Sequence, residues 1–114
     1  MAGPYDCGGY YPGTLPSGGT LMRFVFVRAV SFPAGLTGSQ TSAATAATAQ
    51  TDIDIQLNGV SIGTMRFAAA GTVATFVDFD ATNCLIGDVL TLVAPGTADA
   101  TLANIGWMFK GTRG

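Results

Sequence analysis

Apolar and polar residues alternate most regularly in the middle of the chain, over residues 52–57, whose sequence is DIDIQL. This period of two predicts a strand with one face in the core and the other in water. Asn58-Gly59 follows directly and favours a tight hairpin, because both turn positions want a positive φ. The return strand, residues 60–67, loses its alternation across Gly63, which predicts a β-bulge there.

A second apolar run, residues 21–30 with the sequence LMRFVFVRAV, carries large side chains of both parities. Met22 and Phe24 share one parity, and Val25 and Val27 share the other. This pattern predicts a strand that is buried on both faces. Arg23 and Arg28 have opposite parity within the run, and an unpaired buried charge is costly. Each guanidinium is therefore expected to reach a carboxylate, a carbonyl group or water.

The rest of the chain contains further strand patterns and no helical one. Residues 39–50 are mostly alanine, serine and threonine without an apolar stripe of helical period, which favours an extended segment over a helix. Strands are also predicted over residues 72–80, 89–94 and 102–111, with a loop over 81–88. In the last strand Ile105, Trp107 and Phe109 share one face. The predicted fold class is all-β, a β-sandwich or jelly-roll-like fold of six to eight antiparallel strands.

The first twenty residues are rich in glycine and proline and have no strand or helix period. They predict an extended N-terminal arm over residues 1–20, beside a β-sandwich domain over residues 21–114. The arm is either a flexible tail or a segment in which Tyr5, Tyr10, Tyr11 and the adjoining Pro12 anchor against a neighbouring subunit. Its removal is expected to weaken docking and to leave the fold intact.

Composition excludes most catalytic chemistry. The 114 residues include no histidine and no glutamate, so Ser-His-Asp and Cys-His nucleophilic sites, histidine-ligated metals and glutamate general acids are absent. Five basic residues against seven acidic ones give a net charge of −2, which cannot neutralise a run of phosphates. We expect a protein that is not an enzyme, holds no cofactor and does not bind nucleic acid.

Charge is scarce, and this scarcity is the most informative feature of the composition. Charged residues make up 11% of the chain and hydrophobic ones 48%, against about 25% charged in an average soluble domain. A surface of Ala, Thr, Gly and Ser is poorly protected against association, so we expect a subunit of a larger assembly. Charged residues interrupt every apolar stretch and residues 1–13 carry no basic residue, so neither a membrane span nor a secretory signal is expected.

Two pairs of aspartates stand on strand faces, Asp52 with Asp54 and Asp78 with Asp80. A solvated strand face explains both pairs. The alternatives are calcium bound between loops by oxygens of Asp78, Asp80, Asn83 or Asp88, and an aspartate-only glycosidase that uses Asp52 or Asp54.

Trp107 with Tyr10 and Tyr11 could stack on a sugar, although its alternation with Ile105 and Phe109 favours the core. Cys7 and Cys84 are interpreted as free thiols. The alternative is a disulfide that forms in an oxidising medium.

Residues 21–114 resemble a small β domain that recurs in virion proteins of tailed phages. The resemblance rests on RFVFVRAVSFPAGLTGS, on the hairpin sequence IQLNGVSIGT after the Ala/Thr tract, and on GDVLTLVAP and DATLANIGW near the C-terminus. It implies a β-sandwich that assembles on the virion, commonly as a trimer. The N-terminal segment is not part of the shared pattern.

This family includes capsid decoration proteins, also called cement proteins, and modules of head or tail fibres. A fibre adhesin needs a shaft, and this chain has only twenty residues beside its domain, which favours decoration. We therefore expect a virion structural protein, made in the host cytoplasm, that contacts itself and a major capsid protein. The expected contact residues are Tyr5, Tyr10, Tyr11, Pro12, Arg23 and Arg28. The alternative is a carbohydrate- or receptor-binding head that uses Asp99 and the loop from Asp78 to Asp88.

Overall fold

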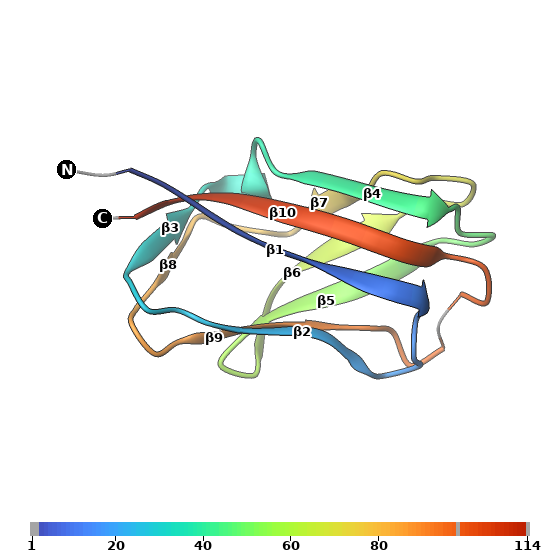
Figure 1. Ribbon diagram of the computed structural model, residues 1–114, viewed down its shortest axis with the longest axis horizontal. Coiled ribbons are helices and arrows are strands. Elements are labelled where there is room, and N and C mark those ends of the chain that lie inside the picture. Colours follow the sequence, from blue (N-terminus) through green and yellow to red (C-terminus); the bar gives the residue numbers. More distant parts are fainter. Residues whose placement is uncertain (1–2, 98, 114) are drawn as a thin grey trace.

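The protein consists of two antiparallel β-sheets packed face to face, as the computed structural model of residues 3–97 and 99–113 shows (Figure 1). Each sheet has five strands. The strands are β1 Gly3–Thr14, β2 Thr20–Val25, β3 Val30–Phe32, β4 Gln40–Thr45, β5 Thr51–Leu57, β6 Val60–Phe67, β7 Thr75–Val77, β8 Thr82–Cys84, β9 Val89–Val93 and β10 Ala103–Arg113. The predicted all-β sandwich is confirmed. No helix in the described residues is long and apolar enough to cross a membrane.

The order of the strands is that of a jelly roll. One sheet has the order β1-β10-β3-β8, with β4 also paired to β10, and the other has the order β2-β9-β5-β6-β7. β4 pairs with residues 103–108 of β10 and β3 with residues 112–113, so they follow each other along the side of β10 that faces away from β1. β7 and β8 are likewise successive segments, one in each sheet. If β3 and β4 are counted as one interrupted strand and β7 and β8 as another, the ten strands become eight, within the predicted six to eight. The first strand pairs with the last.

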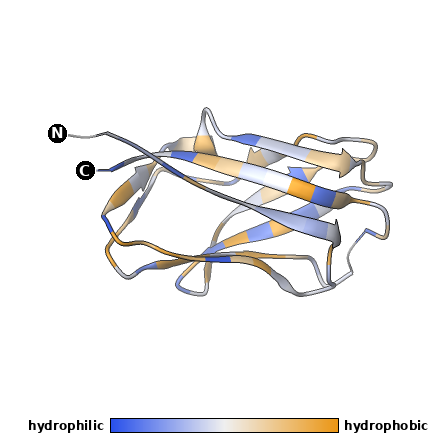
Figure 2. Ribbon diagram, in the orientation of Figure 1, coloured by the Kyte–Doolittle hydropathy of each residue, from blue (hydrophilic) through white to orange (hydrophobic). Residues whose placement is uncertain are grey.

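The central hairpin forms as its sequence predicts. β5 and β6 pair up to Leu57 and Val60, and the turn residues Asn58 and Gly59 have φ of 52° and 83°. Ile55 lies opposite Gly63, and Gln56 lies opposite Ser61. Ile62 is therefore the extra residue of a bulge, which confirms the prediction at the lost alternation. Figure 2 shows the alternating hydrophobic and hydrophilic bands along β5.

From Gly3 onward, where the structure describes the chain, there is no extended N-terminal arm. Residues 3–14 form β1, which pairs with β10 from Gly3 opposite Arg113 to Thr14 opposite Ala103. The glycines that suggest a loop are needed because β1 runs beside large side chains: a Cβ on Gly9 would lie 2.9 Å from Cζ2 of Trp107. Pro4 and Pro12 stand on this edge strand, where a missing N–H is tolerated. The prediction of an arm apart from the sandwich is therefore wrong for these residues.

Four local predictions have mixed outcomes. The Ala/Thr tract forms strand β4. The predicted strand over 72–80 shortens to β7, since Asp78 has a φ of 57°, and the predicted loop over 81–88 contains β8. The predicted strand over 21–30 ends with β2 at Val25, and Val25 and the following Val27 are 52% and 70% exposed, so this segment buries one face and not two.

Candidate interaction surfaces

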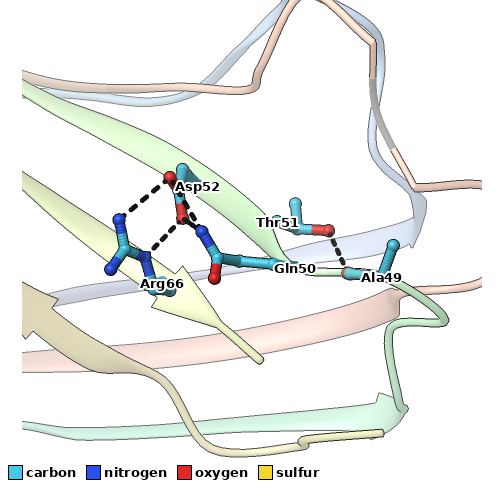
Figure 3. Close-up of polar contacts among 5 residues, drawn as sticks. All are labelled: Ala49, Gln50, Thr51, Asp52 and Arg66. Atoms are coloured by element: carbon cyan, nitrogen blue, oxygen red, sulfur yellow. Dashed lines mark hydrogen bonds and ion pairs between the residues drawn. The ribbon is translucent and has the colours of Figure 1, made fainter. Parts of the chain in front are cut away.

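The outer face of β5 carries an ion pair. The Nε of Arg66 lies 2.9 Å from Oδ1 of Asp52 and its Nη2 lies 3.3 Å from Oδ2 (Figure 3). Asp54 accepts hydrogen bonds from Gln56 at 2.8 Å and from Ser61 at 2.5 Å. Asp52 and Asp54 share one half-exposed strand face, as predicted, and each carboxylate has partners of its own. This arrangement is that of a solvated strand face.

Asp99 ties two loops together. Its Oδ2 accepts hydrogen bonds from the backbone of Thr48 and Ala49 and from the Thr48 hydroxyl, at 2.7–3.0 Å. Its Oδ1 accepts from the backbone of Thr101 and Leu102 and from the Thr101 hydroxyl, at 2.8–2.9 Å. The hydrogen bond from the Thr48 hydroxyl, followed by those from the backbone of Leu102 and Thr101, holds the pKa of Asp99 well below its usual value. Both oxygens serve the fold, which leaves Asp99 poorly placed to recognise a ligand.

Replacing Asp99 with asparagine is expected to lower the free energy of unfolding at neutral pH and to flatten its pH dependence. Because the folded pKa is depressed, this stabilisation is present above the unfolded pKa of about 3.9 and is lost as the pH falls towards the folded pKa. Urea unfolding at neutral and acidic pH measures both effects. The exposed Asp80→Asn is the control, and equal pH profiles for Asp99→Asn and the parent would contradict the prediction.

The other loop carboxylates lie at separate places in the structure. Asp88 accepts from the backbone of Leu85 at 2.8 Å and from the Asn58 side chain at 3.1 Å, and these two bonds, in that order, lower its pKa. Asp78 and Asp80 line a separate polar cavity of about 420 Å³, with Ser61, Ile62, Gly63, Thr64 and Thr82 around it. Among the described residues no three acidic, cysteine or histidine side chains gather where they could hold a metal ion.

Trp107 lies in the core and does not form a stacking platform with the tyrosines. Its side chain is 4% exposed and its Nε1 lies 3.1 Å from Sδ of Met22. Tyr10 is 61% exposed and stands on the opposite face of the same sheet, since it is opposite Gly106 and not Trp107. The core interpretation of Trp107 is confirmed.

Cys7 and Cys84 are buried free thiols, as predicted. Burial, followed by the nearby Cys84, raises the pKa of Cys7 to about 12. Burial, followed by the charge of Asp88, raises the pKa of Cys84 to about 11. Because a thiol reacts as the thiolate, both side chains are inert at neutral pH and act as small apolar core groups.

The six residues expected to make contacts do not share one surface. Tyr5 and Tyr11 pack against the core, whereas Tyr10 and Pro12 are exposed on the outer face of β1. Arg23 lines a groove of about 490 Å³ on the other sheet, together with Gln56, Asn58 and residues of β9. Arg28 is exposed in the connection between β2 and β3.

One end of the sandwich carries a cluster of exposed aliphatic side chains, which we term the apolar end. Val25, Val27, Leu85 and Ile86 are 52%, 70%, 64% and 73% exposed. They stand on two adjoining segments, because the backbone of Gly87 donates to the carbonyl of Phe26 at 2.8 Å and the backbone of Phe26 donates to that of Asp88 at 3.0 Å.

Sequence reasoning missed the apolar end. The shared parity of Val25 and Val27 with Arg23 is the signal that places these valines on a solvent face.

Comparison with known proteins finds no matching family model, no matching curated protein and no matching solved structure.

Proposed function

We propose that this chain is a structural protein of a tailed-phage virion, and that it decorates the capsid shell and clamps neighbouring capsid subunits. The apolar end carries the proposal. Four aliphatic side chains more than half exposed, on two segments tied by backbone hydrogen bonds, form the kind of patch that marks a protein interface. The resemblance of residues 21–114 to phage virion domains supplies the partner, a major capsid protein.

The jelly-roll order of the strands agrees with this proposal without requiring it, since capsid and lectin domains share that fold. In the proposed setting the protein is made in the host cytoplasm and placed on the virion surface. Several copies on one shell gain avidity, so a modest contact at each apolar end is enough to hold the shell together.

A charge placed in the apolar end is expected to weaken docking. Val27→Asp and Ile86→Asp each put a carboxylate into the contact, and each is expected to weaken binding to shells assembled from the capsid protein by about tenfold or more. Co-sedimentation with the shells measures this loss. Val73→Asp is the matched control, because Val73 is 63% exposed and lies in the β6–β7 connection at the other end of the sandwich (Figure 1). Equal binding by all three variants and the parent would refute the proposal.

The second candidate function is carbohydrate or receptor binding by a fibre head, and the polar cavity beside Asp78 and Asp80 favours it. No aromatic ring lines that cavity, and Asp88 and Asp99 are engaged by the fold. A glycan array decides between the two functions. Binding by the parent chain that Asp80→Asn removes would replace the decoration proposal.

A further inference from the structure

The outer faces of the two sheets differ in charge. The second sheet presents Arg23, Asp52, Asp54 and Arg66 on β2, β5 and β6. In the first sheet, residues 7–14 of β1, 40–45 of β4 and 103–109 of β10 include no charged residue. A broad uncharged sheet face in water is poorly protected against association.

Two large side chains lie on this uncharged face, each beside a glycine of the neighbouring strand. Tyr10 of β1 is 61% exposed and opposite Gly106 of β10, and Met108 of β10 is 48% exposed and opposite Gly8 of β1. A Cβ on Gly106 would lie 4.0 Å from Cδ1 of Tyr10, and a Cβ on Gly8 would lie 2.8 Å from Sδ of Met108. A hollow of about 410 Å³ opens beside Met108, lined in part by Ser42 and Gly106. The face therefore carries both protrusions and recesses.

One acidic and one basic side chain lie at one end of this uncharged face. Asp6 of β1 is opposite Lys110 of β10, and both residues are exposed. Within the described residues neither side chain takes part in an ion pair. The Lys110 side chain extends over Gly38, since its Cδ would lie 2.8 Å from a Cβ there. Both charges are thus open to a partner.

We propose that this surface, the Tyr10 face of Asp6, Tyr10, Gly106, Met108 and Lys110, binds a second copy of this chain. A twofold axis can lie in the contact plane, parallel to the strands and above the seam between β1 and β10. It then places β1 of each copy over β10 of the other copy. It sets Asp6 against the partner copy's base, so opposite charges meet. Tyr10, whose hydroxyl donates to Oδ1 of Asn104 at 3.2 Å and whose ring therefore lies along β10, faces the partner copy's glycine.

The contact is two strands wide, about 10 Å by about 36 Å at ordinary strand spacing and rise. It is therefore smaller than a standard interface, and the dimer is weak in solution and reinforced when both copies are held on one shell. The inference rests on the proposed function for this setting, but the dimer itself is measured without a shell.

Sedimentation equilibrium of the full chain from micromolar to millimolar concentration tests the pairing. The parent is expected to approach the mass of two chains. Gly106→Arg puts a long charged side chain into the middle of the contact, at a position where an added Cβ meets nothing closer than 3.9 Å; this variant is expected to remain a single chain. Asp6→Lys is expected to weaken pairing by about tenfold or more, and the double variant Asp6→Lys with Lys110→Asp to restore it.

Thr91→Arg, on β9 in the opposite sheet, is the matched control and is expected to pair like the parent. Circular dichroism verifies that each variant is folded. A parent that stays a single chain, a parent of three chains, pairing by Gly106→Arg, or no rescue in the double variant would overturn the Tyr10 face as the contact. Shell binding is scored separately: a parent that docks on the shell but does not pair refutes this inference alone, and a parent that pairs but does not dock refutes the proposed function alone.

Discussion

A chain that lacks residues 1–14 is expected to lose its folded state. β1 pairs with β10 along its whole length, and Cys7 within it is fully buried. Tyr5 packs against the rings of Phe24 and Phe26, with centroids 6.4 Å away in each case. Deletion removes these side chains, opens one edge of β10 and exposes the core beneath. This is the opposite of what the glycine- and proline-rich sequence predicts for an arm.

The size of the effect follows from burial. Each buried large apolar side chain contributes about 1.5–3 kcal/mol, and Tyr5, Cys7 and Tyr11 all face the core. Together with a lost strand ladder this approaches the roughly 5–15 kcal/mol of an entire domain. Near-ultraviolet circular dichroism and a thermal melt measure the loss. Tyr10→Ser, which alters only an exposed side chain of β1, is the control. A cooperative melt by the shortened chain would show that β1 is dispensable.

Phe26→Ala is expected to lower the free energy of unfolding by about 3–5 kcal/mol, the usual effect of emptying a buried aromatic site. Phe26 is 1% exposed. Its ring centroid lies 5.0 Å from that of Phe24, 6.0 Å from that of Phe32 and 6.4 Å from that of Tyr5, so it joins β1, β2 and β3. The alanine leaves a cavity among three rings that rigid sheets cannot close.

Urea unfolding at neutral pH measures this change, with Val27→Ala as the matched control. Val27 is the next residue and is 70% exposed, so its truncation is expected to change stability by less than about 0.5 kcal/mol. Equal stability of the two variants would contradict the assignment of Phe26 to the core.

The elements that the sequence predicts correctly depend on neighbours close in the chain. Asn58 and Gly59 adopt the positive φ that their hairpin needs, and the lost alternation at Gly63 marks a real bulge. Ile105, Trp107 and Phe109 share a buried face because one strand has a period of two. For each of these features the decisive interactions lie within about ten residues.

The errors occur where partners are far apart in the sequence. The sequence predicts a loop at Gly8 and Gly9. Their neighbours in the sheet, Met108 and Trp107 of β10, are about a hundred residues away in the chain. The sequence predicts that Val25 and Val27 are buried, because hydropathy does not show which face of this segment a second sheet will cover. The hydrogen-bond partners of Asp99 are also far away in the sequence, since its carboxylate accepts from the backbone of Thr48 and Ala49.

By itself the sequence determined the fold class, the central hairpin and the lack of histidine chemistry, because composition and local periodicity set them. Only the tertiary structure decided that the N-terminal segment is a strand of the sandwich, that Tyr5 and Tyr10 face opposite ways, and that four exposed aliphatic side chains lie on adjoining segments at one end. The physical reason is that the burial of a strand's edges and faces depends on which other strands cover them. In a jelly roll that partner comes from the far end of the chain.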